Sequence, residues 1–302
     1  MMHSPLRYPG GKSDFFACAR EIFENGGCRG LPVVEPYAGS AAVSLGLLDF
    51  GLTPHVTLVE RDPIIFSFWY AAFFRTDELI TRFQELPITV QTWQAFQPLL
   101  ALKEPDPARV VDMGLAGLFF NRANFSGILA AGPIGGKQQA SRYKIDCRTN
   151  KDDIISRLLA LAMHSDRVTV AFGDAVAWIK KYSKRKKVFF YLDPPYFKKG
   201  ELLYRHSYGL LQHRQLADEL RAASFKWLLS YDDHPVIELL YEETYLQRLS
   251  FRYSAYSPKN HVELLISNFP VAVPVEFTGV PVRRQRHSIA EREMFHNAVS
   301  AG

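Results

Sequence analysis

The chain has 302 residues, 47% hydrophobic and 22% charged, with a net charge of +5 and a pI of about 9.0. This is the composition of an ordinary globular protein, and the absence of any apolar run of about 18 residues predicts no membrane span. Cys18, Cys28 and Cys147 are too few and too scattered to predict a disulfide framework or a zinc site. The mild basic excess suits a polyanionic partner, and the N-terminus lacks a signal-peptide core, which predicts a cytoplasmic protein.

The first third of the chain predicts the beginning of an α/β sheet. Leu31–Glu35 is predicted to be a buried strand, Ala41–Phe50 an apolar helix that ends before Gly51, and His55–Glu60 a second strand. A strand–loop–helix–strand unit of this kind opens a parallel sheet.

Residues 63–150 differ from this pattern. They predict successive helices broken by prolines, at Thr76–Leu86, Thr92–Leu102 and Ala108–Phe120. The stretch 121–144 is rich in Gly, Ser and Ala with basic residues near its end, which predicts a hairpin at about 124–145 or a long loop.

Strands and helices alternate again after residue 150. The predicted strands are Arg167–Phe172, Val188–Leu192, Lys226–Tyr231, Thr244–Arg252 and His261–Phe269, of which the last two are close enough to pair antiparallel. The predicted helices are Asp174–Tyr182, Gln212–Ala223 and Pro235–Tyr241. We therefore expect one α/β domain made of residues 1–62 and 151–278, interrupted by a helical domain at 63–150. The basic tail, 279–302, is expected to be disordered or a short helix.

The strongest chemical signal is the tetrapeptide Asp193-Pro194-Pro195-Tyr196, directly after the predicted strand Val188–Leu192. Sites in open α/β sheets form at the carboxyl ends of strands. A carboxylate and a fixed backbone carbonyl can each accept one N–H bond from an exocyclic amino group and direct its lone pair at a methyl donor. Pro195 has no N–H of its own to occupy that carbonyl, and Tyr196 offers a flat face for an extruded base.

A second signal is the loop in VVEPYAGSAAVSL, residues 33–45. A strand ends in an acidic residue, and a Gly-containing loop then leads into a helix N-terminus, which lets a cofactor approach the backbone closely. Glu60 ends the next strand about 20 residues after Gly39, the spacing of an acid that holds ribose hydroxyls.

The third signal is Leu6–Ser13, LRYPGGKS. Its Gly-Lys-Ser resembles part of a phosphate-binding loop, but that motif requires glycine where Leu6 stands and a preceding strand. We interpret the aromatic residue and the lysine around the Gly-Gly turn instead as a site for the amino-acid end of a cofactor.

Together and in this order, the three motifs resemble the Dam-like (D12) class of DNA adenine-N6 methyltransferases, over most of residues 6–270. The family's aromatic-x-Gly-Gly-Lys turn is matched by Tyr8–Lys12, its Glu-Pro-aromatic-x-Gly loop by Glu35–Gly39, and its late Glu-Leu-Leu strand by Glu263–Leu265. The family also carries a helical target-recognition insert, matched by about 63–150. One departure is Ala41, where the family has a glycine, so a slightly less tight loop is expected.

The resemblance implies a Rossmann-like methyltransferase sheet, S-adenosylmethionine as methyl donor, no metal, and double-stranded DNA as partner, in a bacterial or phage-encoded protein without a membrane or protein partner. The implied catalytic residues are Asp193, Pro194 and Tyr196. The implied cofactor-binding residues are Tyr8, Lys12, Glu35, Pro36, Tyr37, Gly39, Glu60, Asp174 and Asp193, with Glu60 on the ribose and Asp174 near the adenine. The implied DNA-binding residues are Asn121, Arg122, Phe125, Ser126, Lys137 and Arg142, although Arg122 could instead form a structural ion pair.

The recognition segment predicts a change of DNA site. GATC-reading members of the family carry a segment resembling Asn-Gly-Leu-x-Arg, whose arginine reads guanine. The matching stretch here is Ser126-Gly127-Ile128-Leu129-Ala130, and Ala130 has no donor. A preference for a site other than GATC is expected, unless a small loop shift brings Lys137 or Arg142 to the same guanine.

Other activities remain open at this point. An adenine-N6 enzyme acting on RNA is the nearest rival, although a large helical insert favours duplex DNA. A cytosine-N4 enzyme more usually has Ser in place of Asp193, and a cytosine-C5 enzyme needs a cysteine, usually after a proline, which none of the three cysteines follows. A DNA-binding relative without catalysis is disfavoured by the intact Asp-Pro-Pro-Tyr.

Overall fold

The computed structural model describes residues 4–7, 15–197, 208–252 and 260–271, and the chain divides into two compact units. The first unit comprises residues 1–13 and 32–175, and the second comprises residues 14–31 and 176–302. Seven strands form one mixed sheet in the order β3-β2-β1-β4-β5-β7-β6. The predicted α/β class with a mostly parallel sheet is confirmed.

In the first unit, β1 (Val33–Glu35), β2 (Val56–Glu60) and β3 (Val168–Phe172) run parallel, with Glu35 opposite Leu58 and Glu60 opposite Phe172. The connection from β1 to β2 contains α2 (Ala42–Asp49). Because the strands are parallel and in this register, the residues that follow β1, β2 and β3 lie along one edge of the sheet.

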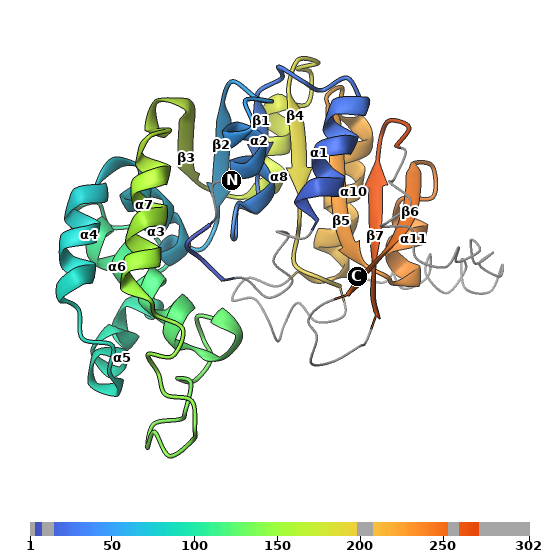
Figure 1. The fold of residues 1–302 in the computed structure, drawn as a ribbon. Coiled ribbons are helices and arrows are strands. Elements are labelled where there is room, and N and C mark those ends of the chain that lie inside the picture. The colour runs from blue at the N-terminus through green and yellow to red at the C-terminus, as the bar shows by residue number, and fades with distance from the viewer. Residues whose placement is uncertain (1–3, 8–14, 198–207, 253–259, 272–302) are drawn as a thin grey trace. The chain divides into compact units, whose positions relative to one another are not determined.

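The rest of the first unit is helical, with helices α3 to α7 drawn together in Figure 1. The helices are α3 (Pro63–Phe74), α4 (Thr76–Glu85), α5 (Val90–Phe96), α6 (Val110–Ala123) and α7 (Lys151–Ala162), with short 3-10 turns at Gln97–Ala101, Pro107–Arg109, Phe125–Gly127 and Ser165–Arg167. α3 contacts β2 and β3 as well as α6, so the first helix of this region packs directly on the sheet.

Two glycines allow α6 to pack closely on α3. A Cβ atom at Gly114 would lie 2.7 Å from the Ser67 carbonyl oxygen, and one at Gly117 would lie 3.0 Å from the Ile64 carbonyl oxygen. The first distance is shorter than real contacts allow, so α6 can follow this path only with glycine at position 114.

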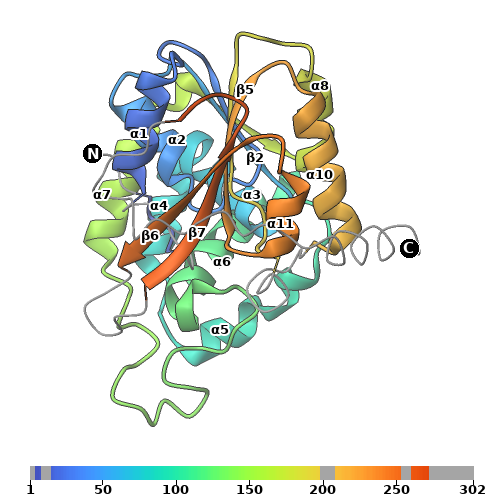
Figure 2. The ribbon, with the colours of Figure 1, turned by 90° about the vertical axis from the view of Figure 1, so that its right-hand side faces the viewer.

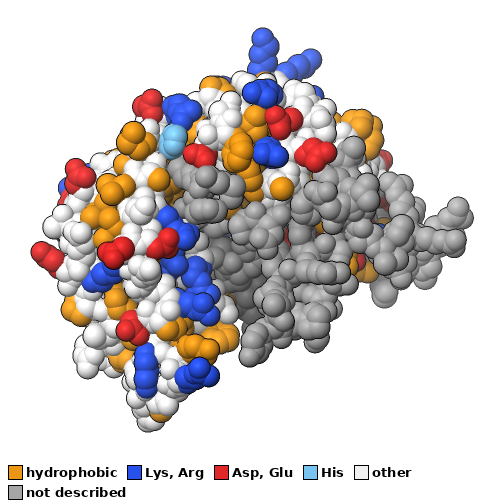
Figure 3. Space-filling model, in the orientation of Figure 1, with side chains coloured by type: hydrophobic (Ala, Val, Ile, Leu, Met, Phe, Trp, Pro, Cys, Tyr) orange, Lys and Arg blue, Asp and Glu red, His pale blue; other side chains and the backbone are white. Residues whose placement is uncertain are grey.

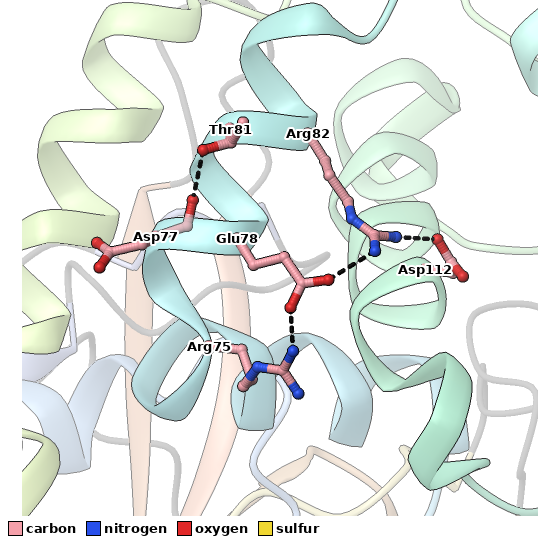
Figure 4. Close-up of polar contacts among 6 residues, drawn as sticks. All are labelled: Arg75, Asp77, Glu78, Thr81, Arg82 and Asp112. Carbon is pink, nitrogen blue, oxygen red and sulfur yellow. Dashed lines mark hydrogen bonds and ion pairs between the residues drawn. The ribbon is translucent and has the colours of Figure 1, made fainter.

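Charged side chains add a surface link between α4 and α6. Figure 4 shows the Arg82 guanidinium between Glu78 on its own helix, at 2.6 Å, and Asp112 on α6. Arg75 donates to the other oxygen of Glu78. These groups are largely exposed, so each pair contributes at most about 1 kcal/mol, and the buried faces of the helices dominate.

The second unit holds β4 (Phe189–Leu192), β5 (Lys226–Asp232), β6 (Tyr245–Arg252) and β7 (Asn260–Ser267). β4 and β5 are parallel, whereas β7 runs antiparallel to β5 and β6. The predicted antiparallel pairing of the last two strands is thus confirmed. Its helices are α1 (Phe16–Asn25), α8 (Ala175–Tyr182), α10 (Leu210–Ala222) and α11 (Pro235–Leu240).

β4 is buried on both faces, which explains its unbroken apolar sequence. On one face, Phe189 meets Phe23 of α1 edge-on at 4.9 Å; on the other, Phe190 stacks on Phe225 at 4.0 Å. Figure 2 shows α1 and α10 on opposite sides of the strands of this unit. The alternation of side chains along the strand therefore decides on which face of the sheet each residue packs.

Most predicted elements are present within one to three residues of their expected bounds, but α1, α3 and α7 are helices for which no bounds were predicted. The predicted hairpin at 124–145 contains one isolated antiparallel bridge, between Asn124 and Pro133, and otherwise consists of turns. The structure therefore fits the alternative of a long loop. The predicted tail, 279–302, lies outside the described residues.

Candidate functional site

The loop after β1 carries strained backbone and a buried acid. Gly39 has φ +45° and Ala41 has φ +51°, in the left-handed region, where an alanine is strained. Glu35 is 3% exposed, and its carboxylate accepts the Ser44 N–H in the first turn of α2 at 3.2 Å. An anion at a helix N-terminus is favourable, so Glu35 stabilises the loop's exit into α2.

Glu60, at the end of β2, binds the same loop. One carboxylate oxygen accepts the Gly39 N–H at 3.2 Å, and the other accepts the N–H groups of Arg61 and Asp62, each at 2.9 Å. Burial raises the pKa of Glu60 to about 7, against the opposite effect of these three N–H groups. A carboxylate has about four acceptor positions, so one is left for a hydroxyl group of a ligand.

Trp69 holds the loop from the other side. Its indole N–H donates to the Gly39 carbonyl at 3.0 Å, and the side chain is fully buried. Gly39 is therefore bonded through both its backbone groups, to Glu60 and to Trp69. The contact of Trp69, which the sequence analysis did not identify, shows that α3 helps to shape the loop.

Asp174 follows β3, the strand next to β2. Its carboxylate lies 3.4 Å from the Arg61 guanidinium, and both side chains are substantially exposed. Glu35 and Glu60 thus end two neighbouring parallel strands, and Asp174 follows a third. Pro36 is buried and Tyr37 half-buried in the same loop.

The remaining predicted cofactor residues, Tyr8 and Lys12, lie outside the described residues. The short stretch before them is described and is firmly held. Asn121 accepts the Arg7 N–H and donates to the Arg7 carbonyl, both at 2.6 Å, and Arg157 donates to the Ser4 carbonyl at 3.1 Å. The chain leading to Tyr8 is therefore anchored on α6 and α7.

In the second unit, the Asp-Pro-Pro-Tyr tetrapeptide directly follows β4. Asp193 is half-buried, and one of its oxygens accepts the Ser230 hydroxyl at 2.9 Å. Because Ser230 uses its only proton there, the Tyr191 hydroxyl must be the donor in its 3.2 Å contact with Ser230. Ser230 on β5 therefore orients the Asp193 carboxylate, a role that no sequence motif indicated.

The end of the tetrapeptide is held by two acids. The Tyr196 hydroxyl donates to Glu263 at 2.7 Å, and Glu263, on β7, is only 5% exposed. The next residue, Phe197, donates its N–H to Asp232 at 2.8 Å. Glu263 belongs to the Glu-Leu-Leu match found in the sequence, but its contact with Tyr196 follows only from the pairing of β7 with β5.

Two of the residues that are predicted to bind DNA are buried. Asn121 is 0% exposed and donates to the Gly127 carbonyl at 3.2 Å besides its two bonds to Arg7. Arg122 is 8% exposed and donates to the Pro5 carbonyl. Burial, with Arg157 and Arg7 nearby, lowers the pKa of Arg122 to about 10. In this conformation both side chains hold the N-terminal segment in place, and neither is exposed at the surface.

The other four DNA candidates lie on the surface of the loop after α6. Phe125 is 69% exposed, and Ser126, Lys137 and Arg142 are also exposed. The same loop presents further exposed basic and aromatic side chains that the sequence analysis did not single out, at Tyr143, Lys144 and Arg148. Figure 3 shows Lys and Arg side chains along α7 and this loop. Aromatic rings interleaved with cations are typical of a nucleic-acid surface.

Among the described residues, no group of three or more His, Cys, Asp or Glu side chains could hold a metal ion. None of the described helices is both long enough and apolar enough to span a membrane.

Three solved structures similar to this chain at low sequence identity are described as methyltransferases or candidate methyltransferases. A candidate RNA methyltransferase from Pyrococcus horikoshii is 11% identical, with 89% of this chain and 87% of that chain covered and a TM-score of 0.38. A candidate methyltransferase from Escherichia coli is 11% identical, with 89% and 91% covered and a TM-score of 0.37. A precorrin-6y C5,15-methyltransferase from Geobacter metallireducens is 11% identical, with 88% and 100% covered and a TM-score of 0.33.

No curated protein matches the sequence. A comparison with protein families matches residues 8–259, which include the Glu35–Gly39 loop, the helical region and the Asp-Pro-Pro-Tyr segment. The chain belongs to the D12 class N6 adenine-specific DNA methyltransferase family.

Proposed function

We propose that this protein transfers a methyl group from S-adenosylmethionine to N6 of a flipped adenine in duplex DNA, at a site other than GATC. The observation that carries the proposal is the anchoring of Asp193 and Tyr196. Ser230 holds the first and Glu263 the second, at 2.9 Å and 2.7 Å. An adenine amino group is a poor nucleophile because its lone pair is delocalised, so the acceptors around it must be positioned in advance.

The residues after β4 have the functional groups that this chemistry needs. The Asp193 carboxylate would accept one N–H of the adenine amino group, and the Pro194 carbonyl would accept the other. Pro195 cannot donate to that carbonyl or to any neighbour, and Tyr196 would stack on the base. S-adenosylmethionine supplies an electrophilic methyl group, and the protein's own groups orient the nitrogen toward it.

The loop after β1 suits a nucleoside cofactor. Gly39 has no side chain, so a cofactor could come close to the backbone there. Glu60 keeps one acceptor position for a ribose hydroxyl. Asp174 would contact the adenine of the cofactor, as the family resemblance implies. Tyr8 and Lys12 would hold its amino-acid end.

Duplex DNA is proposed as substrate because the loop after α6 exposes Phe125, Lys137 and Arg142 together. Cations that contact phosphates fix the register of a protein on DNA, while base contacts specify sequence. Ala130 is exposed and has no hydrogen-bond donor where GATC-reading members have arginine. Losing one two-pronged contact to guanine should remove about 1–3 kcal/mol of discrimination.

The first experiment identifies the substrate. The purified protein is incubated with methyl-labelled S-adenosylmethionine and either plasmid DNA or ribosomal RNA, and the methylated nucleoside is identified by mass spectrometry. Label in N6-methyladenine from the plasmid, absent with Asp193→Ala, is the expected result. Label confined to RNA, or found in cytosine, contradicts the proposal.

The second experiment identifies the site. Single-molecule sequencing of the methylated plasmid should locate modified adenines outside GATC. Modification restricted to GATC would show that another residue, such as Lys137 or Arg142, replaces the missing arginine. Once the site is known, 2-aminopurine at the target position should become more fluorescent on binding if the base is flipped.

A further inference from the structure

The densest positive charge of the chain lies away from the residues discussed so far, in the sequence KKYSKRKK at residues 180–187. Six of these eight residues are Lys or Arg and none is acidic, so the segment carries more than the whole net charge of +5. Lys180 and Lys181 lie in the last turn of α8, and the other four basic residues lie in the turn that leads into β4. Lys and Arg side chains project where that turn lies in Figure 1, as Figure 3 shows.

Helix stability explains only part of this charge. Cations in the last turn of a helix are favourable, and Lys180 also pairs with Glu219 at 3.2 Å. The four basic residues from Lys184 to Lys187 are exposed beyond the helix end and pair with no carboxylate among the described residues. Like charges so close together repel one another, so folding does not account for them.

Two aromatic residues hold cations of the segment in place. Trp178 and Tyr182 stack at 5.9 Å, with Lys181 4.2 Å from the Trp178 ring centre and Arg185 4.6 Å from that of Tyr182. Tyr182 also meets the buried Phe190 edge-on at 5.7 Å. The rings are engaged with each other, with the core and with the cations, which favours phosphate groups over stacked bases as the ligand.

The segment is separated from the catalytic residues by the whole of β4. Six residues lead from Lys187 to Asp193, which at about 3.3 Å per residue is about 20 Å. No lysine or arginine side chain spans that distance, so the segment cannot touch a base held at Asp193. Its ligand must be a polyanion that continues well beyond the target base.

We propose that residues 180–187 form a second surface for duplex DNA, which binds the phosphate backbone without reading sequence. The proposal rests on duplex DNA being the substrate. Through this surface the enzyme captures DNA and stays on it between methylation events. Neutralising the surface would therefore change the salt dependence of binding and the number of methylations per encounter, and leave the rate of methyl transfer from a bound complex unchanged.

The test compares the wild-type protein with a quadruple variant, Lys184→Gln, Arg185→Gln, Lys186→Gln and Lys187→Gln. Binding to a duplex made only of G·C pairs, which offers no target adenine, is measured by fluorescence anisotropy over a range of salt concentrations. The plot of log K against log salt has a negative slope, and each lost phosphate contact reduces the magnitude of that slope by about 0.9. A reduction of roughly 2 to 4 is therefore expected. Affinity at moderate salt should fall by about tenfold or more.

A charge-conserving variant, Lys184→Arg, Lys186→Arg and Lys187→Arg, is the matched control and should keep the wild-type slope. Single-turnover methyl transfer on a saturating short duplex should stay within about twofold of wild type in both variants. An unchanged slope and affinity in the quadruple variant overturns the second surface, even though the wild type methylates DNA. Loss of binding to phosphatidylserine vesicles with DNA binding intact overturns it in favour of a membrane. A wild type that neither binds nor methylates DNA contradicts the proposed function itself.

Discussion

The loop after β1 and the loop after β4 both follow parallel strands, but they are shaped by different forces. In the first, the contacts run from backbone to side chain: Gly39 bonds to Glu60 and to Trp69, and two positive-φ residues bend the chain. In the second, residues 193–197 have no positive φ, and neighbouring strands supply partners for the side chains of Asp193 and Tyr196. A loop that is held through its backbone suits the close approach of a cofactor. Side chains that are held by hydrogen bonds suit the positioning of a reacting base.

The largest loss of activity is expected from substitution of Asp193, the residue of the second loop that is proposed to contact the reacting nitrogen. Asp193→Ala should lower single-turnover methyl transfer by at least about 100-fold, because it removes an acceptor positioned for the amino group. The fold should survive, since Asp193 is a half-buried residue at a strand end. Ser230→Ala should give a smaller loss, because the carboxylate is kept and only its orientation is freed. Wild-type turnover in Asp193→Ala would refute the assignment of this loop to catalysis.

The next largest loss of activity is expected when the hydrogen bond of Tyr196 to Glu263 is removed. From the sequence alone, Tyr196→Phe should keep much activity, because the ring that stacks on the base is retained. The bond to the buried Glu263 changes this expectation, since phenylalanine removes a hydrogen bond to a buried carboxylate. That typically costs about 1–3 kcal/mol, or roughly tenfold or more in rate if the loop shifts.

A double-mutant cycle with Glu263→Leu separates stacking from anchoring. Tyr196→Ala should lose most activity whatever stands at position 263. Tyr196→Phe and Glu263→Leu should be strongly non-additive in the rate of methyl transfer, because each removes the hydrogen bond from the Tyr196 hydroxyl to Glu263. Additive losses would show that the hydrogen bond does not position the ring.

A pH dependence is expected for the first loop only. Burial raises the pKa of Glu60 to about 7, and a ribose hydroxyl donates best to the ionised carboxylate. Cofactor binding should therefore weaken as pH falls below 7, by up to about tenfold per pH unit, and level off above it. Calorimetric titration with S-adenosylmethionine between pH 6 and 8 measures this, and Glu60→Gln should bind more weakly with a flat profile. A wild-type affinity that is independent of pH would argue against ribose binding by Glu60.

The smallest effect concerns the strained alanine of the same loop. Ala41→Gly relieves a left-handed conformation worth about 1–2 kcal/mol, but it loses a buried methyl group and makes the unfolded chain more flexible. These terms nearly cancel, so the free energy of unfolding should change by less than about 1 kcal/mol. Gly39→Ala imposes the same strain at φ +45° at a position where no methyl group is packed in the native loop, so it should be destabilising and weaken cofactor binding. Chemical denaturation of both variants tests the contrast, which fails if Gly39→Ala is neutral.

Local sequence signals predicted most of the fold, and the misses have physical causes. The strands of the sheet are short apolar runs bounded by turns, a pattern that depends on neighbours along the chain. α7 has a capping residue, Asn150, and two acids in its first turn, signals that the sequence contains but that were obscured by the preceding polar loop. The expected hairpin did not form strands because Gly135, Gly136 and Gln139 adopt positive φ and turn the chain repeatedly.

The sequence by itself determined which acids stand at strand ends and in what order, because strand periodicity and the Gly and Pro of the following loops are local properties. Only the tertiary structure decided what those residues touch. Ser230 lies 37 positions from Asp193, Glu263 lies 67 from Tyr196, and Asn121 lies 114 from Arg7. Such partners are brought together by the pairing of strands and the packing of helices. The spacing of a motif predicts neither the pairing nor the packing. For that reason the sequence does not reveal that Asn121 and Arg122 are buried and hold the N-terminal segment through hydrogen bonds.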